Sequence, residues 1–269
     1  MFRLKHEKRR IDAGGRRMTL ILLKPAAAPD GPLPGILWIH GGGYTTGMAR
    51  MAYYSCGGKI AKHFGAVVIS PAYRLAPKFP YPAALEDCYA ALEYMADHAE
   101  ELGIDPRRIV VGGESAGGGL AAAVCIYARD RGRIPVAFQF PLYPMLDCED
   151  TPSSRDNHGK GWNTRRNHRG WKCYLGSLYG TDRVPKYASA ARETDYAGLP
   201  PCYTFVTEGE PFRDETLAYV ARLREAGVEA SADVYPGSLH GFDLTCPWLS
   251  KSRKAREKLL RVFGEKLAR

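Results

Sequence analysis

The segment with the sequence GGESAGG, residues 112–118, contains a serine that could act as a nucleophile. Ser115 is the centre of a G-x-S-x-G pattern, in which Gly113 and Gly117 lie two residues to either side. In such a pattern the serine occupies a sharp turn between a strand and a helix, and the glycines let the two elements approach closely. The N–H groups and the positive dipole end of the helix then lie beside the serine oxygen.

A nucleophilic serine needs a base, and His240 is the histidine in the best position. It belongs to the segment GSLHGF, directly after a predicted strand over residues 231–235. Loops at the carboxyl ends of strands in an α/β sheet gather at one edge, and Ser115 also follows a strand there. An imidazole with an ordinary pKa of about 6.5 can take the serine proton and return it to a leaving group.

The base needs a carboxylate to orient it, and three acids follow the predicted strand over residues 203–207. Glu210 is our choice, because it lies in the turn before a helix begins. Asp214 is one turn inside that helix, where an acid typically supports the helix N-terminus. Glu208 is the second alternative. The chain order nucleophile, acid, histidine is the order expected for a G-x-S-x-G serine on this type of sheet.

Backbone N–H groups that could hold an oxyanion follow another predicted strand, residues 36–39. Gly41, Gly42 and Gly43 have no side chain to obstruct a substrate, and the N–H of Ala116 is next to the serine. Each such donor typically stabilises a transition state by ~3 kcal/mol. We expect an oxyanion hole from Gly41, Gly42 and Ala116.

Four further side chains have a predicted place near this site. His40 precedes the three glycines, and we expect it to orient their loop by hydrogen bonding rather than to act as a base. Tyr44, Trp162 and Trp171 are candidates for the substrate pocket. Packing in the core is the alternative for each of the three.

The elements that must position these residues alternate along the chain. Short apolar runs and helical stretches in alternation predict an α/β fold, with a mostly parallel sheet and helices on both faces. Residues 146–196 have a different texture and are predicted to be an insertion over the strand ends, helical around 164–178. Strands are predicted at 16–23, 36–39, 66–70, 109–111, 134–140, 203–207 and 231–235, and helices at 53–64, 82–102, 118–129, 213–226 and 249–267.

Composition excludes several classes of protein. The chain has 269 residues, of which 45% are hydrophobic and 25% charged, as in a soluble globular domain. It has no apolar run long enough for a membrane span and no secretory signal pattern. Its seven cysteines form no C-x-x-C pair and indicate reduced thiols in the cytoplasm. The net charge of +9 gathers near both termini, and we interpret it as solvated surface rather than a nucleic-acid site.

Several motifs together resemble one known family. They are HGGGY at 40–44, YRLAP at 73–77, PYPAALED at 80–87, GESAGG at 113–118 and HGF at 240–242. These segments are similar to the hormone-sensitive-lipase-like group of α/β-hydrolases, over roughly residues 34–245. That group usually carries its triad acid in a DPLxDE stretch, which matches EPFRDE at 210–215 here. The family position is thus Glu210, with Glu in place of Asp, so Asp214 stays open.

The resemblance implies a single α/β-hydrolase domain over residues 1–269 that hydrolyses small, short-acyl esters through an acyl-enzyme. It implies the triad Ser115, Glu210 and His240, and no metal or organic cofactor. Members of the group commonly have an N-terminal helical cap, for which about 15 residues before Arg16 leave little room. We therefore expect a reduced cap made mainly of the 146–196 insertion.

Other functions remain open at this point. An amidase, formamidase or peptidase could use the same triad, and a receptor could bind a small molecule on this fold without turnover. We expect a small-molecule ester as the partner, with no membrane and no nucleic acid. A homodimer through an edge strand or the closing helix is left open.

Overall fold

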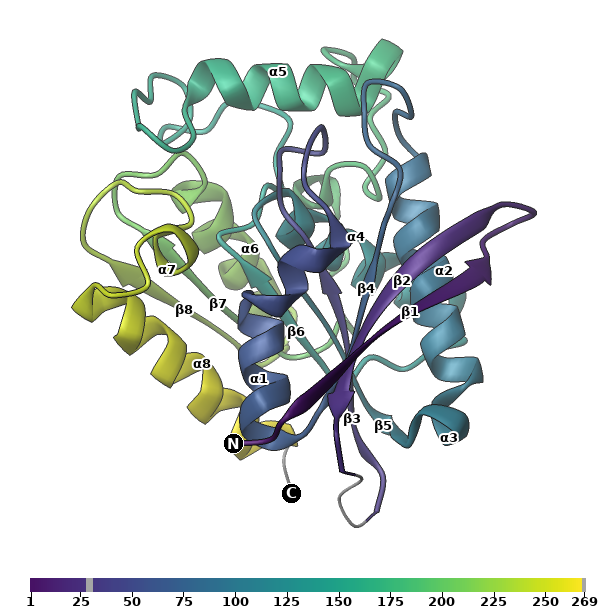
Figure 1. Cartoon of the computed structure of the whole chain (residues 1–269). Coiled ribbons are helices and arrows are strands. Elements are labelled where there is room, and N and C mark those ends of the chain that lie inside the picture. Colours follow the sequence, from purple (N-terminus) through teal and green to yellow (C-terminus); the bar gives the residue numbers. More distant parts are fainter. Residues whose placement is uncertain (28–30, 268–269) are drawn as a thin grey trace.

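One eight-stranded sheet forms the centre of the molecule, as seen in the computed structural model, which describes residues 1–27 and 31–267 (Figure 1). The strand order is β1-β2-β4-β3-β5-β6-β7-β8. Strands β1 (Leu4–Asp12) and β2 (Arg17–Pro25) are antiparallel to each other, and β2 is antiparallel to β4 (Val67–Pro71). All the other pairings are parallel. The predicted α/β fold with a mostly parallel sheet is confirmed.

The remaining elements follow in the order expected for alternating strands and helices. The strands are β3 (Leu33–Ile39), β5 (Ile104–Glu114), β6 (Phe138–Leu142), β7 (Cys202–Thr207) and β8 (Ala230–Tyr235). The helices are α1 (Cys56–Phe64), α2 (Ala83–Asp97), α3 (Ala99–Leu102), α4 (Ala116–Arg131), α5 (Thr164–Leu175), α6 (Arg213–Glu225), α7 (Phe242–Thr245) and α8 (Ser250–Leu267). Short 3-10 turns occur at η1 (Ala49–Tyr53), η2 (Gly176–Leu178) and η3 (Ala190–Arg192).

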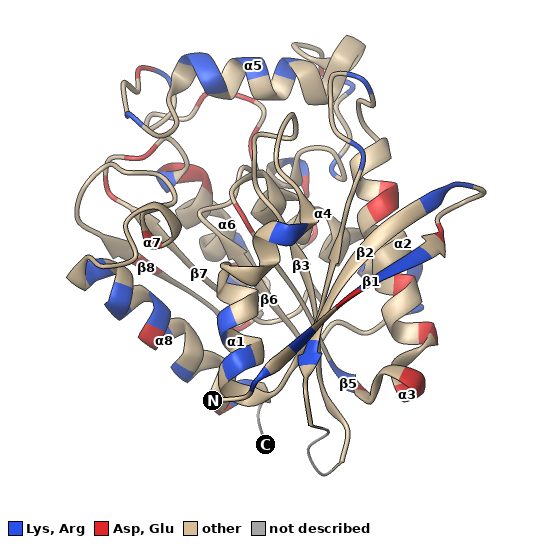
Figure 2. Cartoon of the chain, in the orientation of Figure 1, with Lys and Arg blue, Asp and Glu red and all other residues tan. Residues whose placement is uncertain are grey.

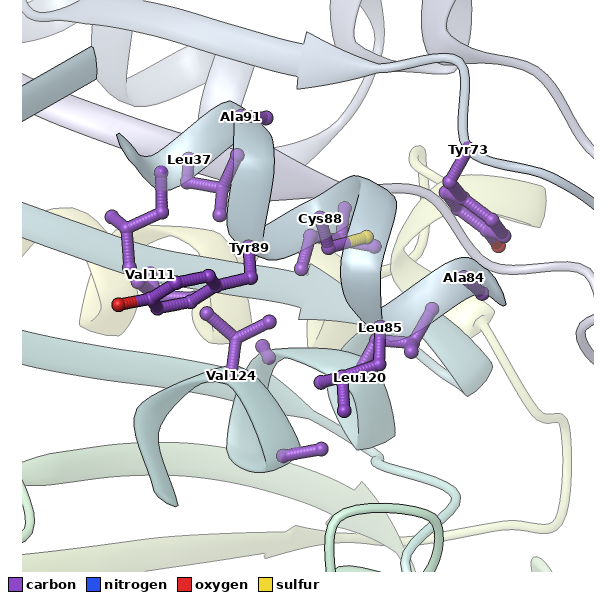
Figure 3. Close-up of a cluster of buried hydrophobic side chains, with 14 of the residues drawn as sticks. Leu37, Tyr73, Ala84, Leu85, Cys88, Tyr89, Ala91, Val111, Leu120 and Val124 are labelled. Atoms are coloured by element: carbon purple, nitrogen blue, oxygen red, sulfur yellow. The ribbon is translucent and has the colours of Figure 1, made fainter. Parts of the chain in front are cut away.

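Alternate side chains of the central strands serve two separate cores, because successive residues of a strand point to opposite faces. In β3, Ile36 and Trp38 pack with the buried side chains of α1 and α8. Leu37 and Ile39 pack on the other face with α2 and α4. Figure 3 shows this second core, in which Leu37 lies among side chains that include Leu85 of α2. Helices therefore cover both faces, as predicted.

The N-terminal strand β1 was not predicted. Only Ile11 of its residues is buried, and most of the others are charged, so no apolar pattern marks it as a strand. Its place is determined by a continuous antiparallel pairing with β2, from Leu4 opposite Pro25 to Asp12 opposite Arg17. Charged side chains are common on edge strands, where they discourage further pairing.

Strand β6 lies further along the chain than the predicted 134–140. It spans Phe138–Leu142 and includes Pro141, the residue directly after the predicted end. Proline has no N–H for the sheet ladder. On this strand Gln139 and Tyr143 donate their N–H groups to Pro201 and Phe205, so Pro141 omits one bond toward β7. The Thr204 hydroxyl donates to the Pro141 carbonyl oxygen instead.

Two predicted helices are divided in the structure. The helix expected at 82–102 is interrupted at His98, whose N–H and Nδ1 both lie within 3.1 Å of the Tyr94 carbonyl oxygen. The helix expected at 53–64 begins as η1 and continues as α1, with Ser55 as the N-cap that accepts the Gly58 N–H. Strand β5 is much longer than the predicted 109–111, and the other predicted helices and strands lie within a few residues of their expected bounds.

Basic residues gather on β1, α1 and α8, whereas α2 and α3 carry acidic residues (Figure 2). The two basic terminal segments of the sequence are therefore parts of β1 and α8. Across residues 1–27 and 31–267, no helix has the length and apolar character needed to cross a membrane.

Candidate active site

Ser115 occupies the turn between β5 and α4, with φ 58° and ψ −122°. This backbone conformation is sparsely populated by L-residues and costs on the order of 1–3 kcal/mol. Two hydrogen bonds hold it: the Ser115 N–H donates to the Leu142 carbonyl oxygen at 3.0 Å, and the Met145 N–H donates to the Ser115 carbonyl oxygen at 3.0 Å. The turn is therefore held by the chain that follows β6.

The glycines on either side of Ser115 are required by close backbone contacts. A Cβ atom on Gly113 would lie 2.4 Å from the Ile39 carbonyl oxygen, and one on Gly117 would lie 2.1 Å from the same atom. Both distances are too short for any side chain. The end of β3 thus packs directly against the turn, which brings the glycine loop after β3 next to Ser115.

The imidazole of His240 joins Ser115 to a carboxylate. His240 lies between β8 and α7, and its Nε2 is 2.8 Å from Ser115 Oγ. Its Nδ1 is 2.5 Å from Oε2 of Glu210, which follows β7. Two backbone bonds tie the loops together, from the Gly209 N–H to the Gly237 carbonyl oxygen and from the Glu208 N–H to the Tyr235 carbonyl oxygen, each 2.9 Å.

The Glu210 carboxylate is completely buried and uses both oxygens. Oε1 accepts the Thr207 N–H at 2.7 Å, whereas Oε2 faces His240. Since a carboxylate can only accept, Nδ1 of His240 carries the proton in this pair, and Nε2 is free to accept the proton of Ser115. Glu210 thus determines the tautomer of His240 as well as its orientation.

The two alternative acids have other surroundings. The Asp214 carboxylate accepts the Ser153 N–H at 2.8 Å and pairs with Arg213. The Ser153 hydroxyl accepts the Asp214 N–H in return, so Asp214 attaches the 146–196 segment to the start of α6. Glu208 is exposed at the surface. Of the three acids, Glu210 is the one that hydrogen-bonds to His240.

His40 organises the glycine loop, as its position suggested. Its Nδ1 donates to the Gly41 carbonyl oxygen at 2.8 Å, and its ring stacks on Tyr73 at 4.2 Å. The Tyr73 hydroxyl donates to the His40 carbonyl oxygen at 2.9 Å. Burial lowers the pKa of His40 to about 4, so the ring is neutral at pH 7 and serves as a fixed hydrogen-bond donor.

The predicted oxyanion donors lie on two sides of Ser115. Gly41 is so close that an added Cβ would fall 3.2 Å from Ser115 Cβ and 2.8 Å from the Glu114 carbonyl oxygen. Gly42 follows it, with its carbonyl turned into the loop, and Ala116 is the first residue of α4. The structure therefore places Gly41 against the Ser115 turn, with Gly42 and Ala116 the next residues along the chain from Gly41 and Ser115.

Three aromatic rings surround the His240 imidazole. Tyr143 and Phe212 meet it nearly perpendicularly, with ring centroids at 5.1 Å and 5.0 Å. The indole of Trp162 is 6.3 Å away and also covers the glycine loop, since a Cβ on Gly43 would lie 2.2 Å from its ring. The Trp162 ring therefore closes one side of the space beside His240.

The other two pocket candidates belong to a buried aromatic cluster. Tyr44 stacks on Tyr174 at 4.0 Å and donates its hydroxyl hydrogen bond to the Met145 carbonyl oxygen at 3.0 Å. Trp171 is 5.3 Å from Tyr44 and only 1% exposed. Both rings thus pack α5 against the glycine loop, and they do not reach His240 as Trp162 does.

The comparison with protein families agrees with this arrangement of elements. A family model described as the alpha/beta hydrolase fold matches residues 36–244. The chain belongs to this α/β-hydrolase family. The predicted resemblance to the hormone-sensitive-lipase-like group of α/β-hydrolases is thereby confirmed.

Known relatives of this α/β-hydrolase are esterases. The esterase LipI of Mycobacterium tuberculosis is 33% identical over 225 residues, which cover 83% of the α/β-hydrolase and 70% of LipI. The carboxylesterase NlhH of the same species is 34% identical over 213 residues, covering 78% and 66%. The α/β-hydrolase thus spans about two thirds of the length of these curated relatives.

Solved structures agree over almost the whole chain. A bacterial heroin esterase is 39% identical, with a TM-score of 0.91, and the match covers 98% of the α/β-hydrolase and 84% of that chain. The esterase LipW from Mycobacterium marinum is 31% identical, with a TM-score of 0.89, covering 98% and 82%.

Three side chains of the α/β-hydrolase lie close behind the site and were not singled out from the sequence. Glu114 precedes Ser115, and its buried carboxylate accepts the Trp38 indole N–H at 2.7 Å and the Cys56 N–H at 3.3 Å. Asp243 and Tyr143 hydrogen-bond to each other at 2.9 Å. The sequence signal available for each was its position. Glu114 is immediately before Ser115, Asp243 is three residues after His240, and Tyr143 directly follows a strand.

Stability of the α/β-hydrolase is expected to fall with rising pH because of Glu114. Burial and the nearby Asp243 raise the pKa of Glu114 from 4.5 to about 8. The folded state thus binds a proton that the unfolded state releases. This contribution is fully present below pH 4.5 and is lost as the pH rises through about 8. At about 1.4 kcal/mol per pKa unit, the loss amounts to a few kcal/mol.

The measurement is the urea unfolding free energy of wild type and Glu114→Gln between pH 5 and pH 9. The glutamine retains the shape but cannot ionise, so its hydrogen-bonding defect is the same at every pH. Wild type should lose stability relative to the variant as the pH rises. Parallel curves for the two proteins would contradict the assignment.

Proposed function

We propose that this enzyme, a carboxylic ester hydrolase, acts through a triad in which Ser115 is the nucleophile, His240 the general base and Glu210 the orienting acid. The observation that carries the proposal is the continuous hydrogen-bonded chain from Ser115 Oγ through both ring nitrogens of His240 to Glu210. A nucleophile within hydrogen-bond reach of a base, itself held by a third group, is the arrangement required for acyl transfer. Relatives named as esterases and carboxylesterases support the same reaction.

In the first half of the reaction, His240 Nε2 takes the Ser115 proton while Oγ attacks the ester carbonyl carbon. The negative charge that develops on the carbonyl oxygen is held by the N–H groups of Gly41, Gly42 and Ala116. The positive charge that forms on the imidazole is stabilised by Glu210. His240 Nε2 then gives its proton to the departing alcohol, which leaves an acyl group on Ser115.

The second half of the reaction repeats these steps with water. His240 removes a proton from a water molecule, which attacks the acyl carbon, and the oxyanion is held by the same three N–H groups. Collapse of this intermediate breaks the bond to Oγ, and His240 returns the proton to Ser115. The acid product departs, and the starting state of the enzyme is restored.

We infer that the chain is a single domain and that residues 146–196 form a partial cap over Ser115. In support, α5 lies over the end of the sheet that carries the site (Figure 1), and the indole of Trp162 covers Gly43 beside His240. A large ring so close to the reacting atoms leaves little length for the acyl group. We infer a preference for short-acyl esters.

The test is hydrolysis of nitrophenyl esters from acetyl to dodecanoyl by wild type, Trp162→Ala and Trp171→Phe. Wild type should prefer the short acyl groups. Removing the Trp162 indole should raise the ratio of octanoyl to acetyl turnover by about tenfold, or ~1.4 kcal/mol, since pocket contacts contribute 1–3 kcal/mol per methylene. Trp171→Phe changes a tryptophan outside the site and should leave the ratio unchanged.

Nitroanilides with the same acyl groups test the alternative of an amidase. If wild type cleaved the anilides faster than the esters, the ester assignment would be wrong. An unchanged chain-length preference in Trp162→Ala would contradict only the role of that ring.

We also infer a cytoplasmic location. All seven cysteines are free, including four that are buried, as expected for a chain kept in a reducing compartment.

A further inference from the structure

Tyr143 lies immediately behind the His240 imidazole and has an unusual backbone. It is the first residue after β6, fully buried, with a φ of 33° that a residue with a Cβ rarely adopts. Its N–H donates to the Phe205 carbonyl oxygen at 2.9 Å, which holds it to β7. The rings of Tyr143 and His240 meet at 5.1 Å with an interplanar angle of 82°.

The hydroxyl of Tyr143 points to a second buried carboxylate. It donates to Oδ1 of Asp243 at 2.9 Å, across 100 positions of the sequence. Asp243 is in the first turn of α7, three residues after His240, and is completely buried. The Cys56 thiol is 3.4 Å from its other oxygen. One hydrogen bond thus connects Tyr143, whose ring contacts the imidazole, to Asp243, which lies on the same segment as His240.

The Tyr143–Asp243 pair is an unfavourable choice if its role is only to fill the core. Burying a carboxylate is unfavourable, and hydrogen bonds offset the loss of hydration only in part. Asp243 also lies near the buried Glu114 and raises the pKa of that carboxyl, and Lys59 is the cation that lowers the pKa of both groups. Asparagine or an apolar residue would pack here at less cost. Stability is therefore a poor reason for the presence of Asp243.

Reaction geometry provides a better reason. Phe212 meets the imidazole from another direction, at 5.0 Å and 76°, so His240 is held between two rings. The Tyr143 ring can keep the imidazole in place only if the orientation of the Tyr143 ring is itself fixed. A displacement of about 1 Å in such a group can reduce a rate 10²-fold.

We propose that Tyr143 and Asp243 form one unit that positions His240 for proton transfer. The inference rests on the proposed function, in which His240 is the base. Asp243 fixes the Tyr143 hydroxyl, the Tyr143 ring fixes the imidazole, and α7 fixes the chain on which His240 lies. Neither residue touches the substrate, so the unit should affect the rate of the chemical step and leave substrate binding unchanged.

The experiment compares Tyr143→Phe, Asp243→Ala and the double variant on nitrophenyl acetate. Active sites are counted by titration with a phosphonate that reacts with Ser115, so misfolded protein does not enter kcat. Tyr143→Phe retains the ring and removes the donor, and Asp243→Ala removes the acceptor of the Tyr143 hydroxyl without adding bulk. We expect each single variant to lower kcat about tenfold with KM within twofold of wild type, consistent with ~1.4 kcal/mol. The double variant should be no worse than the more affected single variant.

The matched control is Tyr203→Phe. The Tyr203 hydroxyl also donates to a carboxylate, that of Asp233, at 2.8 Å, but between β7 and β8 and in contact with Phe140 instead of His240. Its kcat per titrated site should equal that of wild type. A similar fall in this control would show that any such bond matters, and would overturn the proposal.

Two further results would also overturn it: wild-type kcat per titrated site in Tyr143→Phe, and fully additive losses in the double variant. If Asp243→Ala does not fold, Tyr143→Phe and its control decide alone. Failure of the proposed function is recognised separately, because the phosphonate would then not react at Ser115 in wild type.

Discussion

Replacing Ser115 with alanine is expected to lower ester turnover on the order of 10⁶-fold. The variant lacks the atom that bonds to the acyl group, and no other hydroxyl is hydrogen-bonded to His240 Nε2 among the described residues. The weak activity that remains would come from the oxyanion donors and substrate binding alone. The measurement is kcat/KM on nitrophenyl acetate, with unfolding followed to confirm an intact fold.

The fold of Ser115→Ala should be unaffected for a specific structural reason. The Ser115 side chain makes no capping hydrogen bond to α4, and the strained turn is held by backbone bonds to Leu142 and Met145. Ser70→Ala is a suitable control, since the Ser70 hydroxyl is buried in β4 without a partner. Ser70→Ala should hydrolyse esters as wild type does, and turnover retained in Ser115→Ala would refute the nucleophile.

Replacing Glu210 with glutamine is expected to lower kcat about 10⁴-fold, the effect typical of a triad acid changed to its amide. The direction follows from the Thr207 N–H, which donates to one side-chain oxygen of Glu210. That bond holds the amide oxygen of the glutamine and turns its NH₂ group toward His240 Nδ1. Nδ1 must then accept, so the ring proton moves to Nε2, where it blocks transfer from Ser115.

Asp214→Asn is the matched comparison, because it makes the same chemical change at the alternative acid. Asp214 accepts the Ser153 N–H and pairs with Arg213, so its loss should weaken the attachment of the 146–196 segment and leave kcat within several-fold of wild type. Kinetics of both variants on one ester discriminate the two acids. A large loss in Asp214→Asn with a small loss in Glu210→Gln would reverse the assignment.

The difference between these acids illustrates what spacing in a sequence cannot resolve. Glu208, Glu210 and Asp214 all lie between the end of β7 and the first turn of α6, and each was chemically suitable. Their distances to His240 depend on how the loop after β7 meets the loop after β8, through bonds such as that from the Gly209 N–H to the Gly237 carbonyl oxygen. The family resemblance favoured Glu210 because equivalent motif positions in one fold family lie at equivalent places in the structure. Such a comparison therefore includes how the loops meet.

The predicted strands show the same limit at the level of secondary structure. Central strands such as β3 are buried on both faces, so an apolar run was enough to find them. Strand β1 lies at the edge with only Ile11 buried, and only its hydrogen bonds with β2 determine it. The predicted strand 134–140 stopped just before Pro141, but the hydroxyl of Thr204 hydrogen-bonds to the Pro141 carbonyl oxygen within the sheet.

The sequence by itself determined the parts of this protein that depend on neighbouring residues. The turn at Ser115 requires glycines two positions away, and the glycine loop requires small residues directly after a strand, so both are visible as short motifs. Tertiary structure alone decided which distant groups meet. The bond between Tyr143 and Asp243 spans 100 positions, and Trp162 reaches Gly43 from a separate segment. Such contacts arise from the packing of whole elements, which no local pattern of residues encodes.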